Sequence, residues 1–155
     1  MARMTDDPRD VPDHDHRVPD GASDALVEAV GGVTAALEVT EHARGMLYAF
    51  HRLTGRADIE LAEALDKLAA AGEPELADEI RADLVGRNVL NGRWTFQVVE
   101  DYDEGYWSTF RHWEREVRDR LMAGRRHVYE AQMKESNRTH GREGHEARPV
   151  ETTTG

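Results

Sequence analysis

Four polar residues with the capacity for chemistry fall on one face of an expected helix. They recur at spacings of three and four residues and are Glu41, Arg44, Tyr48 and His51. The same spacing upstream carries apolar residues, so this face is expected to pack against the rest of the protein. Because burial of an unpaired charge is costly, the charged members need partners or must lie at the edge of the core. They are therefore the first candidates for a ligand-binding site.

Two interpretations of this set remain open. In the structural one, Glu41 and Arg44 form a partly buried ion pair, and His51 is hydrogen-bonded at the end of its helix. In the functional one, they form the polar floor of a pocket opposite the acidic run at residues 100–104. Asp103 lies beside the aromatic face of that later segment and is the acidic residue expected to point inward. The ligand set is then Glu41, Arg44, Tyr48, His51 and Asp103.

A metal site would have to use histidine and carboxylate ligands, since the chain has no cysteine. Glu38, Glu41 and His42 lie within one helical turn and could hold a metal ion, although a solvated helix edge explains them equally well. The Glu-x-x-His motif of carboxylate-bridged di-iron bundles does not occur. Histidines near the two ends of the chain are expected to be incidental. The sequence requires no cofactor.

Motifs for catalysis are equally scarce. No Gly-x-Ser-x-Gly, phosphate-loop or dinucleotide-binding motif occurs, so no catalytic residue is assigned. The chain has 31 acidic and 20 basic residues and a net charge of −11, which disfavours nucleic acid and anionic membrane surfaces as partners. No apolar run approaches the roughly 20 residues of a membrane span, and the first residues do not resemble a secretory signal. We expect a cytoplasmic protein.

The elements that position these residues are expected to be helices. The first spans 23–54, with Ser23 as its N-cap and Gly55 after its end, and the glycine pair at 31–32 is the expected site of a break or kink. A second, short helix begins at Asp58 and stops at Gly72.

The remaining helices follow a proline and a turn. Pro74 begins a third, short helix, and a long last helix covers about 94–134, with Gly105 and Gly124 as candidate bends. The Asn91-Gly92 pair before it is a strong hairpin signal, but the segment ahead of it is too short for a full strand. We therefore expect a turn followed by a helix.

The sequence thus predicts an all-α protein of 155 residues: a small antiparallel helical bundle built on two long helices joined by a short helical pair, with disordered tails. Residues 1–20 are expected to be a disordered acidic N-terminal tail and 137–155 a second tail, because neither offers apolar side chains to a core. The bundle domain is then 21–136.

An aromatic stripe on the last helix gives the leading functional hypothesis. Its members are Tyr102, Tyr106, Trp107, Phe110 and Trp113. Aromatic side chains dominate interface energetics, so we expect a non-catalytic interaction or regulatory module that binds another protein or its own copy as a homo-oligomer. The alternative is a bundle that binds a metal or small ligand, with oxidoreductase activity at a histidine and carboxylate site.

Overall fold

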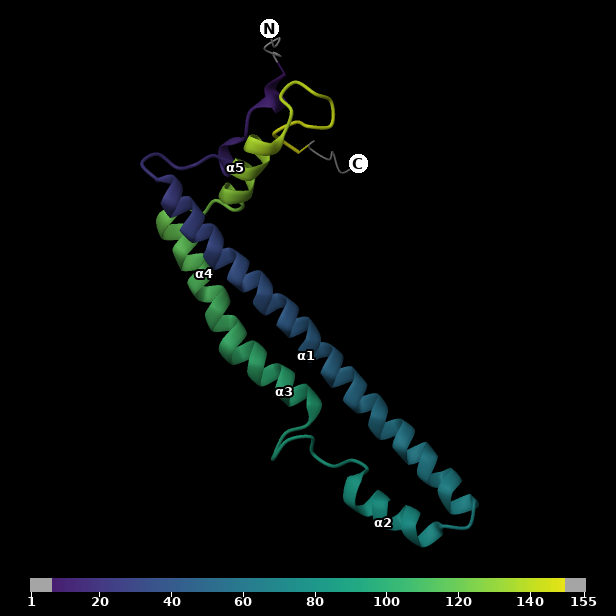
Figure 1. Cartoon of the computed structure of the whole chain (residues 1–155). Coiled ribbons are helices and arrows are strands. Elements are labelled where there is room, and N and C mark those ends of the chain that lie inside the picture. Colours follow the sequence, from purple (N-terminus) through teal and green to yellow (C-terminus); the bar gives the residue numbers. More distant parts are fainter. Residues whose placement is uncertain (1–6, 150–155) are drawn as a thin grey trace, which may run out of the picture. The chain divides into compact units, whose positions relative to one another are not determined.

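The structure is a computed structural model that describes residues 7–149. Its α-helices are α1 (Asp24–Ala70), α2 (Pro74–Leu84), α3 (Thr95–Tyr102), α4 (Ser108–Leu121) and α5 (Val128–Asn137) (Figure 1). Short 3-10 turns occupy Pro8–Asp10 and His14–His16, and a π-helical turn, Asp103–Trp107, joins α3 to α4. No strand occurs in this part of the chain, and the predicted all-α class is confirmed.

The chain divides into two compact units. Unit 1 is formed by the described residues of the stretches Met1–Glu38 and Arg111–Gly155, and unit 2 is formed by Val39–Phe110. α1 therefore contributes its beginning to unit 1 and its remainder to unit 2. The two units are described separately below.

α1 is longer than the sequence indicated. The predicted break at residues 31–32, the end before Gly55 and the separate helix from Asp58 are wrong, because one helix of 47 residues runs through all three positions. The predicted short helical pair is accordingly reduced to α2 alone. Gly31 has a packing role instead: a Cβ atom there would lie 2.8 Å from the Tyr129 Cβ, so glycine permits the close approach of α5.

The segment between α1 and α3 follows its local signals. Pro74 occupies the first turn of α2, and Gly86 after this helix has a φ of +75°. Leu90 and Arg93 exchange two backbone hydrogen bonds of 3.4 and 3.0 Å around the Asn91-Gly92 turn. The expected turn followed by a helix is confirmed.

The expected last helix is divided at the two predicted glycines. Gly105 lies within the π-helical turn, and Gly124, with a φ of +72°, lies in the break between α4 and α5. His127 also has a positive φ, of 56°, immediately before α5. The long aromatic period therefore belongs to three successive helical elements.

Unit 1 has a small apolar core. Val27 and Val30 of α1 pack with Met122 and Val128, and all four are buried. Next to them, buried Glu114 of α4 receives hydrogen bonds from Thr34 and Arg118. Because residues near 27 meet residues near 122 while Thr34 meets Glu114, the two helices run in opposite directions within this unit (Figure 1).

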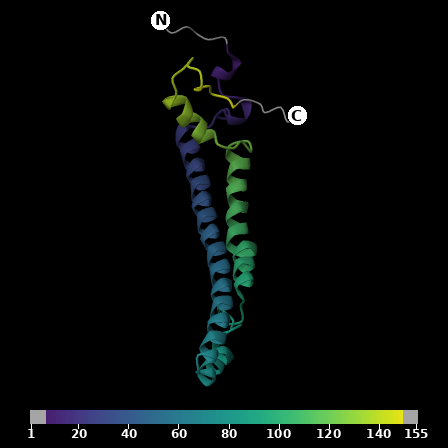
Figure 2. The same ribbon diagram turned by 90° about the vertical axis from the view of Figure 1, so that its right-hand side faces the viewer.

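The described ends of the chain meet in unit 1, and Figure 2 shows them side by side. The Arg138 side chain is only 2% exposed and binds Asp10 at 2.5 Å and Glu135 at 2.7 Å. The backbone amides of residues 147 and 148 donate to the carbonyl of Arg9. Residues 7–20 and 138–149 thus have specific contacts that their composition did not indicate, while residues 1–6 and 150–155 of the expected tails lie outside the described residues.

Unit 2 joins α2 and α3 to the later part of α1. Within unit 2, the later part of α1 buries Leu65, α2 buries Ala77 and α3 buries Val99. Arg81 of α2 donates to the Asp66 carboxylate of α1 at 2.6 Å. Asp58 of α1 accepts the backbone N–H of Gly86 at 2.8 Å, which holds the loop after α2 against α1.

Candidate functional site

The polar residues predicted on α1 meet the π-helical turn of unit 2. The guanidinium of Arg44 donates from Nε to Asp103 Oδ1 at 2.6 Å and from Nη2 to Oδ2 at 2.9 Å. This bidentate geometry fixes the register of α1 against the turn more firmly than a single contact would. The expectation that Asp103 points inward matches its position in the structure.

Two aromatic rings complete the surroundings of this guanidinium. The Arg44 Cζ atom lies 4.0 Å from the centroid of the Trp107 ring and 5.1 Å from that of Tyr48. Trp107 is held in turn by a hydrogen bond from its Nε1 to Glu41 Oε1 at 2.9 Å. We call the set Glu41, Arg44, Tyr48, Asp103 and Trp107 the Arg44 centre.

The π-helical turn explains how one short segment supplies two members of the Arg44 centre. Asp103 is its first residue and Trp107 its last, and both contact α1. π-helical turns are rare and recur at functional positions, where they change the direction of side chains relative to a regular helix. At Gly105, in the middle of the turn, no neighbouring atom lies within 4 Å of the position that a Cβ would occupy.

The predicted pairing inside the Arg44 centre is wrong in one respect. Arg44 pairs with Asp103, whereas Glu41 accepts a hydrogen bond from Trp107. His51 lies on α1 one helical turn after Tyr48, and its Nδ1 is 2.7 Å from Thr95 Oγ1 at the start of α3. His51 is therefore not at a helix end, because α1 continues to Ala70.

The charges of the Arg44 centre satisfy one another. The hydrogen bonds from Arg44 lower the pKa of the Asp103 carboxyl, and those to Asp103 raise the pKa of Arg44. Both groups therefore stay ionised at neutral pH. A general acid or base works best with a pKa near the working pH, so this ion pair is suited to holding structure more than to transferring protons.

The predicted metal ligands do not form a cluster. Within residues 7–149, no three histidine or carboxylate side chains are placed to share a metal ion. Glu38 and His42 are exposed on α1, and Glu41 is engaged by Trp107. Near the chain ends, His14, His16 and His140 each contact one carboxylate, whereas His145 accepts the backbone N–H of Thr139.

The predicted aromatic interface residues take three different positions. Tyr102, Tyr106 and Phe110 form a ladder with ring centroids 5.8 and 5.9 Å apart, and the Tyr106 residue at its centre is 61% exposed. We call these three residues the aromatic ladder. Trp107 belongs to the Arg44 centre, and Trp113, in unit 1, is exposed beside His112.

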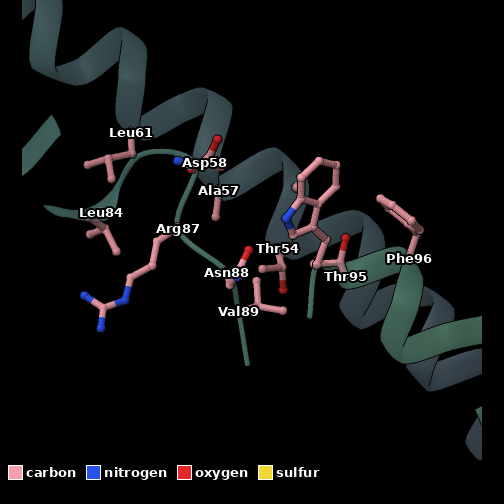
Figure 3. A pocket seen from close by; sticks show the side chains of 13 residues that line it. Thr54, Ala57, Asp58, Leu61, Leu84, Arg87, Asn88, Val89, Thr95 and Phe96 are labelled. Atoms are coloured by element: carbon pink, nitrogen blue, oxygen red, sulfur yellow. Dashed lines mark hydrogen bonds between the residues drawn. The ribbon is translucent and has the colours of Figure 1, made fainter. Parts of the chain in front are cut away.

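Unit 2 also contains a pocket of about 610 Å³ that the sequence did not predict. Figure 3 shows Leu61 and Leu84 at one end and Thr95 and Phe96 at the other. Its lining also includes Trp94, whose ring meets that of Phe96 edge to face at 5.4 Å. The Asn91-Gly92 turn could have indicated this pocket, because it returns the chain toward α1. The other wall is formed by α1 residues from Thr54 onward, whereas the sequence predicts that this helix ends before Gly55.

Comparisons of the chain with protein-family models, curated proteins and solved structures found no match. Among the described helices, none combines the length and apolar character that crossing a membrane requires.

Proposed function

We propose that this protein is a non-catalytic protein-interaction module and that unit 2 supplies the contact surface. The observation that carries the proposal is the uneven exposure of large apolar side chains. Of sixteen that are exposed among residues 7–149, twelve belong to unit 2 and four to unit 1. Large apolar side chains that gather on the surface of one unit are candidates for an interaction site.

The aromatic ladder is the part of this surface that we assign to a partner protein. The exposed ring of Tyr106 is flanked by two half-buried rings, which fix its orientation at little entropic cost. The adjacent turn is fixed by the Arg44 centre, so the ladder presents a pre-organised surface.

Affinity capture with the full chain as bait tests this assignment. The test variant is Tyr106→Lys, and the matched control is Leu76→Lys, which changes an exposed apolar residue of α2 in the same unit. We expect the recovered amount of at least one captured protein to fall tenfold or more with Tyr106→Lys and to stay unchanged with Leu76→Lys. Identical capture by both variants and the original chain would refute the role of the ladder.

A small apolar ligand is the second candidate, and the pocket of unit 2 supports it. A volume of about 610 Å³ with two aromatic and several aliphatic side chains in its lining suits such a molecule. Titration with the fluorescent probe anilinonaphthalene sulfonate should show saturable binding that Leu84→Lys removes and Leu76→Lys retains. Fluorescence that does not saturate, or an equal loss of probe binding in both variants, would refute the pocket as a ligand-binding site.

A further inference from the structure

α1 carries a second apolar face in unit 2, separate from the face that packs. Its members are all exposed, and we call them the α1 stripe: Val39, Ala43, Met46, Phe50, Leu53 and Ala57. Their spacings alternate between four and three residues, which is the heptad rhythm of a coiled-coil seam. At 100° per residue they fall within an arc of roughly 80° that contains no charged side chain.

The packed face of α1 points elsewhere. Thr40, Leu47 and Leu65 are buried or half-buried, and Arg44 and His51 on the same side make the contacts to the π-helical turn and α3. The centre of this face is offset by roughly 100° from the centre of the α1 stripe. The contacts that hold unit 2 together therefore leave the α1 stripe exposed, although its last member, Ala57, also lines the pocket of unit 2.

We propose that a second copy of this chain docks on the α1 stripe, with the two α1 helices running in opposite directions. This inference rests on the proposed interaction function and names the partner for one surface of unit 2. In the proposed register, Val39 faces Ala57 of the second copy, Ala43 faces Leu53, and Met46 faces Phe50. The twofold symmetry repeats each of these pairs, giving six layers over roughly 27 Å of helix.

The proposed register is supported by the sizes of the facing side chains. Val39 and Leu53 each face an alanine, and the two longest members, Met46 and Phe50, face one another at the centre. Large side chains opposite small ones allow two helices to interdigitate without voids. In a parallel pairing each residue faces itself, so the alanine layers leave gaps and the Phe50 layer is crowded.

The exposed area is sufficient for a dimer of moderate affinity. Val39 is 70% exposed, Met46 61% and Leu53 62%. With Phe50 and the two alanines, the stripe presents roughly 500 Å² per copy, so two copies bury roughly 1,000 Å² before flanking residues, at the lower limit of specific interfaces. The net charge of −11 on each copy opposes association, so added salt should strengthen the dimer.

Sedimentation equilibrium of the full chain tests the surface. Leu53→Lys places a charge in the α1 stripe and makes the chain less negative, so loss of the dimer cannot be ascribed to added repulsion. The matched control is Ile59→Lys, because Ile59 lies on the same helix outside the stripe and is also 62% exposed. We expect the dissociation constant to rise at least tenfold for Leu53→Lys and to change less than threefold for Ile59→Lys.

Disulfide formation tests the register, since the chain has no cysteine of its own. Mixing a Val39→Cys chain with an Ala57→Cys chain under mild oxidation should give the mixed dimer in excess of either self-linked dimer. Parallel association would instead link each variant to itself. A mixture of Ala57→Cys with Ala82→Cys on α2 serves as the control and should show only background linkage.

The outcomes separate this inference from the proposed function. A monomer at all concentrations up to hundreds of micromolar in high salt, or a dimer unaffected by Leu53→Lys, overturns the second copy as the occupant of the α1 stripe. Capture of a partner that depends on Tyr106 would leave the interaction function standing in either case. Self-linked Val39→Cys dimers in place of mixed ones would overturn the antiparallel register.

Discussion

Unit 1 and unit 2 distribute polar and apolar side chains in opposite ways. In unit 1 a small apolar core is accompanied by buried charged residues that form ion pairs. Glu114 pairs with Arg118, and Arg138 pairs with Asp10. In unit 2 one face of α1 contacts the π-helical turn and α3, while large apolar side chains on its other faces remain exposed. Unit 2 therefore leaves more apolar surface exposed than unit 1, and this difference supports the proposal that a partner binds unit 2.

The largest expected effect concerns the buried cation that joins the chain ends in unit 1. Arg138→Met leaves the carboxylates of Asp10 and Glu135 without their shared partner and should lower the free energy of unfolding by about 3 kcal/mol. Urea denaturation gives the measurement, and proteolysis near residues 142–148 should accelerate. Arg126→Met, at an exposed position, is the control, and equal losses in the two variants would contradict the account.

The next effect comes from two adjacent glycines of α1. Gly31→Ala brings a Cβ within 2.8 Å of Tyr129 and should destabilise the protein by about 2 kcal/mol. Gly32→Ala adds a Cβ in open space and should stabilise by about 0.8 kcal/mol through helix propensity. Thermal or urea unfolding of both variants provides the comparison, which fails if the two substitutions change stability in the same direction.

In unit 2 the substitution that tests an ion pair, as Arg138→Met does in unit 1, is Asp103→Asn. It weakens the bidentate pair with Arg44 and should cost about 1 kcal/mol at pH 7, because the pair is partly exposed. The pKa of Asp103 is lowered from its usual 3.8, so the pair stabilises the fold above about pH 4 and this advantage disappears as the pH falls through the lowered pKa. Unfolding at pH 7 and pH 3 should show the difference shrinking, and a pH-independent difference would assign it to another cause.

The smallest effect on stability is expected where the effect on binding is largest. Tyr106→Ser removes an exposed ring from the aromatic ladder and should change the free energy of unfolding by no more than about 0.5 kcal/mol. A loss above about 1.5 kcal/mol would show that Tyr106 belongs to the internal packing of unit 2 and would weaken its assignment to a partner.

Features governed by local chemistry were predicted from the sequence. Helix periodicity gave the all-α class, Pro74 gave the start of α2, and the Asn91-Gly92 pair gave the turn. The two glycines proposed as bends, Gly105 and Gly124, do divide the last helix. Each of these signals acts through residues close to one another in the chain.

Features governed by the register between distant segments were not predicted. Gly31 packs closely against Tyr129, roughly 100 residues away in the chain, and helix propensity contains no information on this contact. The partner of Arg44 depends on where the π-helical turn meets α1. Arg138 was assigned to a tail because composition detects apolar cores and misses arginine held by several carboxylate and carbonyl groups.

Oxidative footprinting of three methionines tests the difference between the units most directly. Met46 of unit 2 is 61% exposed, while Met133 and Met122 of unit 1 are 47% and 1% exposed. In dilute solution Met46 and Met133 should oxidise and Met122 should not. As the concentration of the full chain rises, the account predicts protection of Met46 alone, with Met133 unchanged. Protection of Met133, or oxidation of Met46 at an equal rate at every concentration, would contradict the proposal that unit 1 is self-contained and that unit 2 docks a second copy of the chain.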